Sequence, residues 1–130
     1  PTAGGTIDYR AQEKLEEIGN WMDLNSRSIY GCTEAPEGFQ APEHTLLTYN
    51  AETRRLYIHL LDYPMKWLRL EGFGGKVKYA QFLHDGSEIK FGKPRHNVTH
   101  QESLEEKDLM LILPMVKPNV EIPVIELYLN

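Results

Sequence analysis

Two histidines spaced four residues apart are the pair in this sequence whose spacing best suits a metal ion. His96 and His100 would lie on one face of a helix, where both imidazoles could bind zinc. The residues between them, Asn97-Val98-Thr99, contain no acidic residue, and nothing around them predicts a helix. We therefore predict a solvated loop and no metal site. Asn97-Val98-Thr99 also fits the acceptor pattern for N-glycosylation, which matters only if a eukaryotic host secretes the chain.

The single cysteine could be a nucleophile only if a base lay beside it. Cys32 could be paired with His44 or His59, but nothing in the sequence brings these residues together. A small, buried, hydrophobic side chain at a strand is the favoured interpretation of Cys32. One cysteine also excludes an internal disulfide.

Three glutamates in a loop are the clearest cluster of carboxylates. Residues 33–43 contain two prolines and a glycine and are predicted to form a loop, which holds Glu34, Glu37 and Glu43. Spacing within a loop does not set the distance between two carboxyl groups, so a solvated surface is favoured. Gly72-Phe73-Gly74-Gly75 opens no helix and predicts a turn rather than a phosphate-binding loop. The residues thus predict no catalytic group, no metal and no cofactor.

Aromatic side chains could bind a sugar ring by stacking on its apolar face. Trp67, which lies between Lys66 and Arg69, is the best exposed candidate, and we predict it as a weak carbohydrate-binding residue. Packing in a core or at a domain interface is favoured for the aromatic residues as a group, because aromatic rings dominate such contacts. The aromatic residues considered are Trp21, Tyr57, Tyr63 and Trp67.

One helix must come before the strands. Apolar residues recur at steps of three and four and would form one face of an amphipathic helix that ends near Asn25. Gly19 lies inside this pattern and predicts close packing against a neighbour, since glycine costs about 1 kcal/mol relative to alanine in a helix. We call the predicted interface of this helix the helix stripe; it consists of Ile7, Ala11, Leu15, Ile18 and Met22.

After the helix the apolar period changes to two, which is typical of strands. The predicted strands cover residues 45–49, 55–61, 66–70, 76–83, 87–91, 109–113 and 122–129. Within 76–83 we expect Val77 and Tyr79 on one face and an irregularity before Phe82. Asp85-Gly86 predicts a two-residue hairpin turn, and the apolar run 109–113 a central strand. The chain is predicted to be mostly β: an antiparallel β-sandwich of about seven to eight strands preceded by one N-terminal amphipathic α-helix.

Composition excludes two classes of partner. The 130 residues have a formal net charge of −5, which argues against a nucleic-acid-binding protein. No apolar run approaches the roughly 18 to 20 residues of a membrane-spanning helix, so no membrane partner is expected. Because the sequence opens at Pro1 inside a loop-like stretch, we expect it to be a piece of a longer protein.

The helix and the chain that follows it resemble a known family. The motif in Leu15–Met22, which reads L-x-x-I-G-x-W, together with Ser28-Ile29-Tyr30-Gly31, is similar to the junction in family-29 glycoside hydrolases, the α-L-fucosidases. Pro1–Gly5 resembles their loop after the eighth barrel strand. Members usually carry glycine near Ser26, and here Asn25 could adopt the turn conformation instead. The later stretches that match are Arg55–His59, Lys76–Ala80, Leu83–Ile89 and Leu109–Pro114.

The resemblance implies a division of the chain and a role for it. Residues 1–27 would be the loop and helix that end a catalytic (β/α) barrel, and residues 28–130 a C-terminal β-sandwich. The family implies a retaining glycosidase with an aspartate nucleophile and a separate acid/base, on barrel strands that this sequence does not contain. The implied function is non-catalytic support of that barrel in an enzyme that releases α-L-fucose from glycans.

The expected partners follow from the same comparison. In the parent enzyme the helix stripe would pack against the catalytic barrel. Without the barrel it would be covered either by the sandwich of its own chain or by a second copy, and we favour a homo-oligomer. The alternative function is a free-standing carbohydrate-binding β-sandwich module, and a weaker one is an interaction domain with no connection to sugars. A self-contained module has no need of the helix.

Overall fold

In a computed structural model, residues 9–92 and 107–130 are described, with side chains from Gln12 onward in the first helix. The loop predicted around His96 and His100, the glycosylation pattern and Ile7 lie outside these residues. The elements are α1 (Tyr9–Asn25), the short 3₁₀ helix η1 (Ser26–Ser28), β1 (Thr45–Asn50), β2 (Arg55–Leu60), β3 (Trp67–Leu70), β4 (Val77–Phe82), β5 (Lys90–Gly92), β6 (Leu109–Ile112) and β7 (Val124–Leu129).

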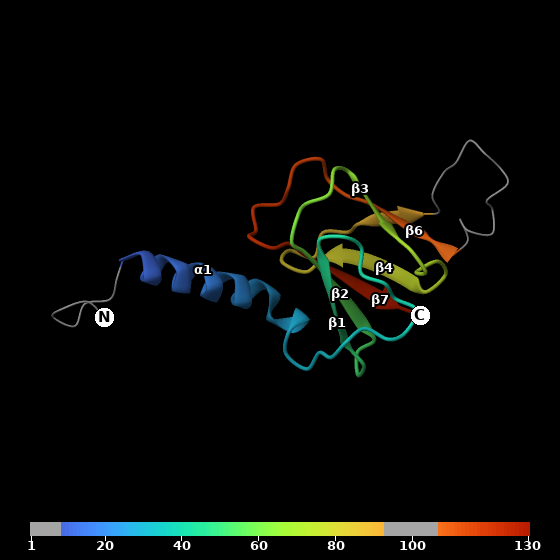
Figure 1. Ribbon diagram of the computed structural model, residues 1–130, viewed down its shortest axis with the longest axis horizontal. Helices are drawn as coiled ribbons and strands as arrows, with labels where there is room; N and C mark the ends of the chain where they lie inside the picture. The colour runs from blue at the N-terminus through green and yellow to red at the C-terminus, as the bar shows by residue number, and fades with distance from the viewer. Residues whose placement is uncertain (1–8, 93–106) are drawn as a thin grey trace.

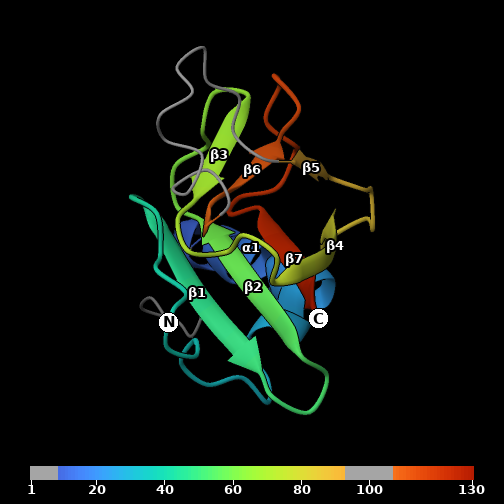
Figure 2. The ribbon, with the colours of Figure 1, turned by 90° about the vertical axis from the view of Figure 1, so that its right-hand side faces the viewer.

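Two antiparallel sheets form the body of the molecule (Figure 2). One has the strand order β1-β2-β7-β4 and the other the order β3-β6-β5. Every strand pairing within the two sheets is antiparallel. The described residues thus contain one α-helix followed by seven strands in a sandwich, which confirms the predicted fold class.

The hairpin and the central strands have the register that the apolar pattern requires. β1 and β2 pair from Thr45 opposite Leu60 to Asn50 opposite Arg55. β6 lies between β3 and β5, which confirms the prediction of a central strand at this apolar run. β7 lies between β2 and β4 in the other sheet, and it is buried on both faces.

The core lies between the sheets and is made by alternate residues of each strand. Leu56, Ile58 and Leu60 of β2 point inward, where they meet residues such as Leu70 and Leu111 of the opposite sheet. Complete burial of each such side chain is worth about 1.5 to 3 kcal/mol. The other face of β2, with Tyr57 and His59, is also buried, so the four-stranded sheet is covered on its outer side as well.

The structure corrects the sequence analysis in β4. The irregularity falls between Val77 and Tyr79, and not before Phe82. An extra residue there reverses the side-chain alternation, so Val77 points into the core with Ala80, while the Tyr79 ring packs against Tyr128. The two residues predicted to share a face therefore lie on opposite faces.

The turn at Asp85-Gly86 forms, but its second arm is short. Gly86 has a φ of 73°, and Gln81 pairs with Glu88 in a single bridge. The chain then crosses to the other sheet, where β5 pairs with β6. The predicted strand 87–91 is thus divided between the two sheets.

Helix α1 ends at Asn25 as predicted and extends away from the sandwich (Figure 1). Residues 12–20 are exposed along this length. The close neighbour predicted for Gly19 is not found among the described residues, since nothing lies within 4 Å of a Cβ placed there.

Candidate functional site

The last turn of α1 and η1 lie on the outer face of the four-stranded sheet, held by buried polar groups. Asn25 and Ser28 are completely buried. The Ser28 carbonyl accepts a hydrogen bond of 2.5 Å from the Thr48 hydroxyl, which lies 3.1 Å from His59 Nε2. Burial lowers the pKa of His59, because the charged imidazolium would lose its hydration, although a hydrogen bond with the Ser28 backbone opposes this effect. The junction is therefore built around a neutral histidine.

Trp21 fixes the same junction from the helix side. Its indole Nε1 donates to the carbonyl of Ile122 at 2.8 Å. Its side chain packs against a small buried cluster formed by Tyr57, Leu83 and Val124. The end of the helix is thus joined to the sheet by both a hydrogen bond and apolar contacts.

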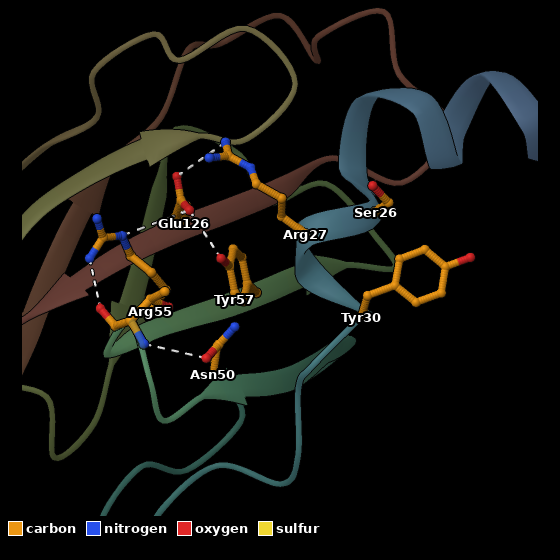
Figure 3. Close-up of a pocket in the computed structure, with 8 residues that line it drawn as sticks. Ser26, Arg27, Tyr30, Asn50, Arg55, Tyr57 and Glu126 are labelled. Atoms are coloured by element: carbon orange, nitrogen blue, oxygen red, sulfur yellow. Dashed lines mark hydrogen bonds and ion pairs between the residues drawn. The ribbon is translucent and has the colours of Figure 1, made fainter.

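A polar pocket of about 250 Å³ opens beside this junction (Figure 3). η1 and the turn after it supply one wall, the β1–β2 hairpin a second, and β2 and β7 the floor. The lining residues are Ser26, Arg27, Tyr30, Asn50, Thr53, Arg55, Tyr57 and Glu126.

A buried carboxylate is the central group of this pocket. Glu126, on the central strand β7, is 1% exposed. Its Oε2 accepts a hydrogen bond of 3.1 Å from the Tyr57 hydroxyl, and its Oε1 accepts one of 2.6 Å from Gln81 Nε2. A buried carboxylate requires such donors, because an ion removed from water without partners would be strongly destabilising.

Two arginines lie near the carboxylate of the pocket. Arg27 Nη2 lies 3.7 Å from Glu126 Oε1, and Arg55 Nε lies 4.0 Å from Oε2. The Arg55 guanidinium also lies 3.6 Å from the centre of the Tyr128 ring, and it donates to the Thr53 carbonyl at 2.8 Å. Burial, followed by the negative charge of Glu126, raises the pKa of Tyr57, so this phenol stays protonated and donates.

This arrangement can bind polar groups but lacks the pair that a retaining glycosidase needs. Glu126 is the one carboxylate that lines the pocket. Retention requires two carboxyl groups roughly 5 Å apart on either side of the bond. The pocket therefore resembles a binding or structural site more than a catalytic one.

Among the described residues, Cys32 is not paired with a base. The Cys32 thiol donates to the Arg27 carbonyl at 3.5 Å, and burial raises the pKa of the thiol, which favours its unreactive form. His59 contacts Thr48 instead, and His44 is exposed. Cys32 itself is partly buried against the cluster beneath Trp21.

The other predicted positions are dispersed over the surface. Trp67 is 54% exposed on β3, with Lys66 Nζ 5.2 Å from its ring centre. The loop glutamates 34, 37 and 43 are exposed as the loop prediction implied. In the helix stripe, Leu15 and Ile18 are exposed, Met22 is half-buried, and the Ala11 side chain lies outside the described residues.

Sequence reasoning missed the pocket itself. A lone glutamate inside the apolar run Val124-Ile125-Glu126-Leu127 was the available signal, since a charged residue in a central strand is rarely buried without partners. Arg27 gave no signal, because it meets Glu126 only through the tertiary fold.

No group of three or more histidine, cysteine or acidic side chains in residues 9–92 and 107–130 could hold a metal ion. No helix in the part of the chain that the structure describes is long and apolar enough to cross a membrane.

Comparison with known proteins shows similarity to α-L-fucosidases. No family model matches the sequence. An α-L-fucosidase of Dictyostelium discoideum is 52% identical over 33 residues, which are 25% of this chain and 7% of that protein. Alpha-L-fucosidase isoenzyme 1 from Paenibacillus thiaminolyticus is similar over 100% of this chain and 29% of its own, with 32% identity and a TM-score of 0.80. A GH29 α-L-fucosidase from Bacteroides thetaiotaomicron has the same fold, with 20% identity and a TM-score of 0.74 over 100% of this chain and 27% of its own.

The chain thus spans less than a third of the length of the similar solved structures. The similar proteins are α-L-fucosidases, the family that the sequence motifs resemble. The chain corresponds to the C-terminal region of a family-29 glycoside hydrolase, an α-L-fucosidase.

Proposed function

We propose that this chain is the non-catalytic C-terminal support of a larger α-L-fucosidase. The catalytic barrel would lie in the preceding part of that enzyme, which would release α-L-fucose from glycans with retention. The observation that carries the proposal is the position of α1. Its last turn is built into the sandwich, while the turns before it extend away with apolar residues exposed (Figure 1).

The exposed part of α1 supports a partner on the N-terminal side. Leu15 is 64% exposed and Ile18 60% exposed. An apolar groove continues from Ile18 past Trp21 to Ile122 of the turn before β7. An exposed apolar surface of this kind on a helix is typical of an interface, because removing apolar side chains from water lowers the free energy.

We further propose that residues 1–27 belong structurally to the barrel and residues 28–130 to the sandwich. In this arrangement the junction sets the orientation of the two parts. The buried groups Asn25, Ser28 and Trp21 would hold the sandwich at a fixed angle to the barrel. Gly19, which has open space around it among the described residues, would allow the barrel to approach the helix closely.

The test is reconstitution from two chains. The region of the source gene upstream of Pro1 would be expressed as one polypeptide and mixed with the 130-residue chain. We expect a one-to-one complex in size-exclusion chromatography with light scattering, and loss of that complex with Leu15→Asp. A folded upstream polypeptide that ignores the chain at high micromolar concentration would contradict the proposal.

Without the upstream part, we propose that the helix stripe covers itself with a second copy of the chain. Among the described residues, the sandwich does not cover Leu15 or Ile18. A two-fold interface would place the same stripe of both copies face to face.

A further inference from the structure

The pocket beside η1 has hydrogen-bond donors that its own residues do not use. Arg27 Nη2 lies 3.7 Å from Glu126 Oε1, which is longer than the roughly 2.7 to 3.2 Å of a hydrogen bond. The Arg27 side chain is 64% exposed. A guanidinium carries several N–H donors in a planar fork. Within the described part of the chain, most donors of Arg27 are therefore available to a ligand.

Asn50 presents a further donor. Its Oδ1 accepts hydrogen bonds from the backbone N–H groups of Glu52 at 3.0 Å and Thr53 at 3.3 Å. This orientation directs the Asn50 amide nitrogen toward the pocket, as Figure 3 shows. The Ser26 hydroxyl lies in the same lining.

The carboxylate oxygens of the pocket already accept hydrogen bonds. Each oxygen of Glu126 accepts a hydrogen bond from within the chain, and the residue is 1% exposed. The proton of the Tyr57 hydroxyl is directed to Glu126. A ligand would therefore meet mainly donors, and it would need to supply acceptors.

The charge of the pocket points in the same direction. Two guanidiniums and one carboxylate line it, so its formal charge is +1 in a chain whose net charge is −5. A ligand with a single negative charge would balance this site. The cavity of about 250 Å³ lies just below the roughly 300 to 1,000 Å³ of pockets for drug-sized molecules, so a group of monosaccharide size fits it.

We propose that this pocket binds the carboxylate of a small acidic sugar, such as a uronic acid residue. The Arg27 fork would bind the carboxylate with two parallel hydrogen bonds, the geometry that guanidinium groups favour. Asn50 would donate to a sugar hydroxyl or to the second carboxylate oxygen. This inference does not depend on the fucosidase function, because every group belongs to this chain.

Titration of the whole 130-residue chain with sodium glucuronate tests the proposal, with glucose as the neutral match. We expect ¹H–¹⁵N NMR signals of Arg27, Asn50 and Arg55 to shift and saturate with glucuronate and to stay unchanged with glucose. Arg27→Gln should weaken binding by about tenfold or more, the usual effect of losing a hydrogen bond between charged groups. Lys78→Gln removes the same charge outside the pocket lining and should leave the affinity unchanged.

Glu126→Gln gives a prediction of opposite sign. The substitution keeps the shape of the side chain and removes the negative charge behind the arginines. Glucuronate affinity should rise by about threefold or more, which follows from Coulomb's law for charges about 7 Å apart in water. If Glu126→Gln does not fold, shown by collapse of the NMR spectrum, the comparison of Arg27→Gln with Lys78→Gln decides alone. Equal binding of glucose, an unchanged affinity in Arg27→Gln, or tighter binding of inorganic phosphate would overturn the proposal.

Discussion

If the helix stripe pairs two copies of the chain, replacing Leu15 and Ile18 with aspartate should yield a folded monomer. Both side chains are exposed on α1, a helix that extends away from the sandwich (Figure 1), and Asn25, where the helix joins the sheet, is completely buried. The substitutions therefore remove an external contact and leave the core intact.

The magnitude follows from the exposed fractions. Complete burial of a leucine or isoleucine is worth about 1.5 to 3 kcal/mol. Leu15 and Ile18 retain 64% and 60% of their exposure, so a partner could gain about 1 to 2 kcal/mol from each. Together these contributions amount to about 2 to 4 kcal/mol per copy, and their loss should weaken the association by at least about 30-fold.

Sedimentation velocity between 5 and 500 μM, roughly, would measure the association, and near-UV circular dichroism would report on the fold. A matched control, Gln12→Glu with Asn20→Asp, adds the same two charges to amide side chains outside the helix stripe. We expect the control to associate like the original chain.

Two results would refute this reasoning. If the original chain is monomeric at high micromolar concentration while its helix amides resist hydrogen exchange, the helix packs within its own chain. If the aspartate variant loses the sandwich fold, the helix stripe belongs to the folded core rather than to an interface.

Three further predictions concern the stability of the junction and the core. Trp21→Phe removes the donor to the Ile122 carbonyl and should lower the free energy of unfolding in urea by about 1 kcal/mol. The control Trp67→Phe, on the exposed face of β3, should change it by less than about 0.5 kcal/mol. Equal losses in the two variants would contradict the role of that hydrogen bond. Because burial lowers the pKa of His59 in the folded state, the unfolded chain binds a proton first as the pH falls below about 6.5, and stability should fall by up to about 1.4 kcal/mol per pH unit. Urea unfolding at two pH values should show a smaller loss in His59→Gln, and an identical loss would assign the effect to other groups. Gly72→Ala should destabilise the chain by more than about 1 kcal/mol, because φ is +84° there and a Cβ would lie 2.7 Å from the Gly38 carbonyl oxygen. An unchanged melting temperature would show that the backbone can adjust.

Local patterns predicted most of the fold. The alternation in residues 55–61 places Leu56, Ile58 and Leu60 in the core, and the apolar run at 109–113 becomes the central strand β6. These features depend on neighbours in sequence, and a residue's period decides which face it joins. The helix end at Asn25 was predictable for the same reason.

The features that depend on distant residues were not predictable. The displaced irregularity at Val77 and Tyr79 follows from pairing with β7, about 50 residues later in the chain. The pocket joins Arg27 to Glu126, and neither residue has a local pattern that indicates the other. A single sequence shows a charged residue in an apolar strand, but the donors that neutralise it appear only in the folded structure.

Hydrolysis of an aryl α-L-fucoside is the most direct test of the proposal that this chain supports a separate catalytic barrel and is itself non-catalytic. The assay would compare the purified 130-residue chain, the polypeptide encoded upstream of Pro1, and their mixture. We expect no activity above a mock preparation from the chain alone, and the highest activity from the mixture, lowered when the chain carries Leu15→Asp and Ile18→Asp. Fucoside hydrolysis by the isolated chain would contradict the proposed support function.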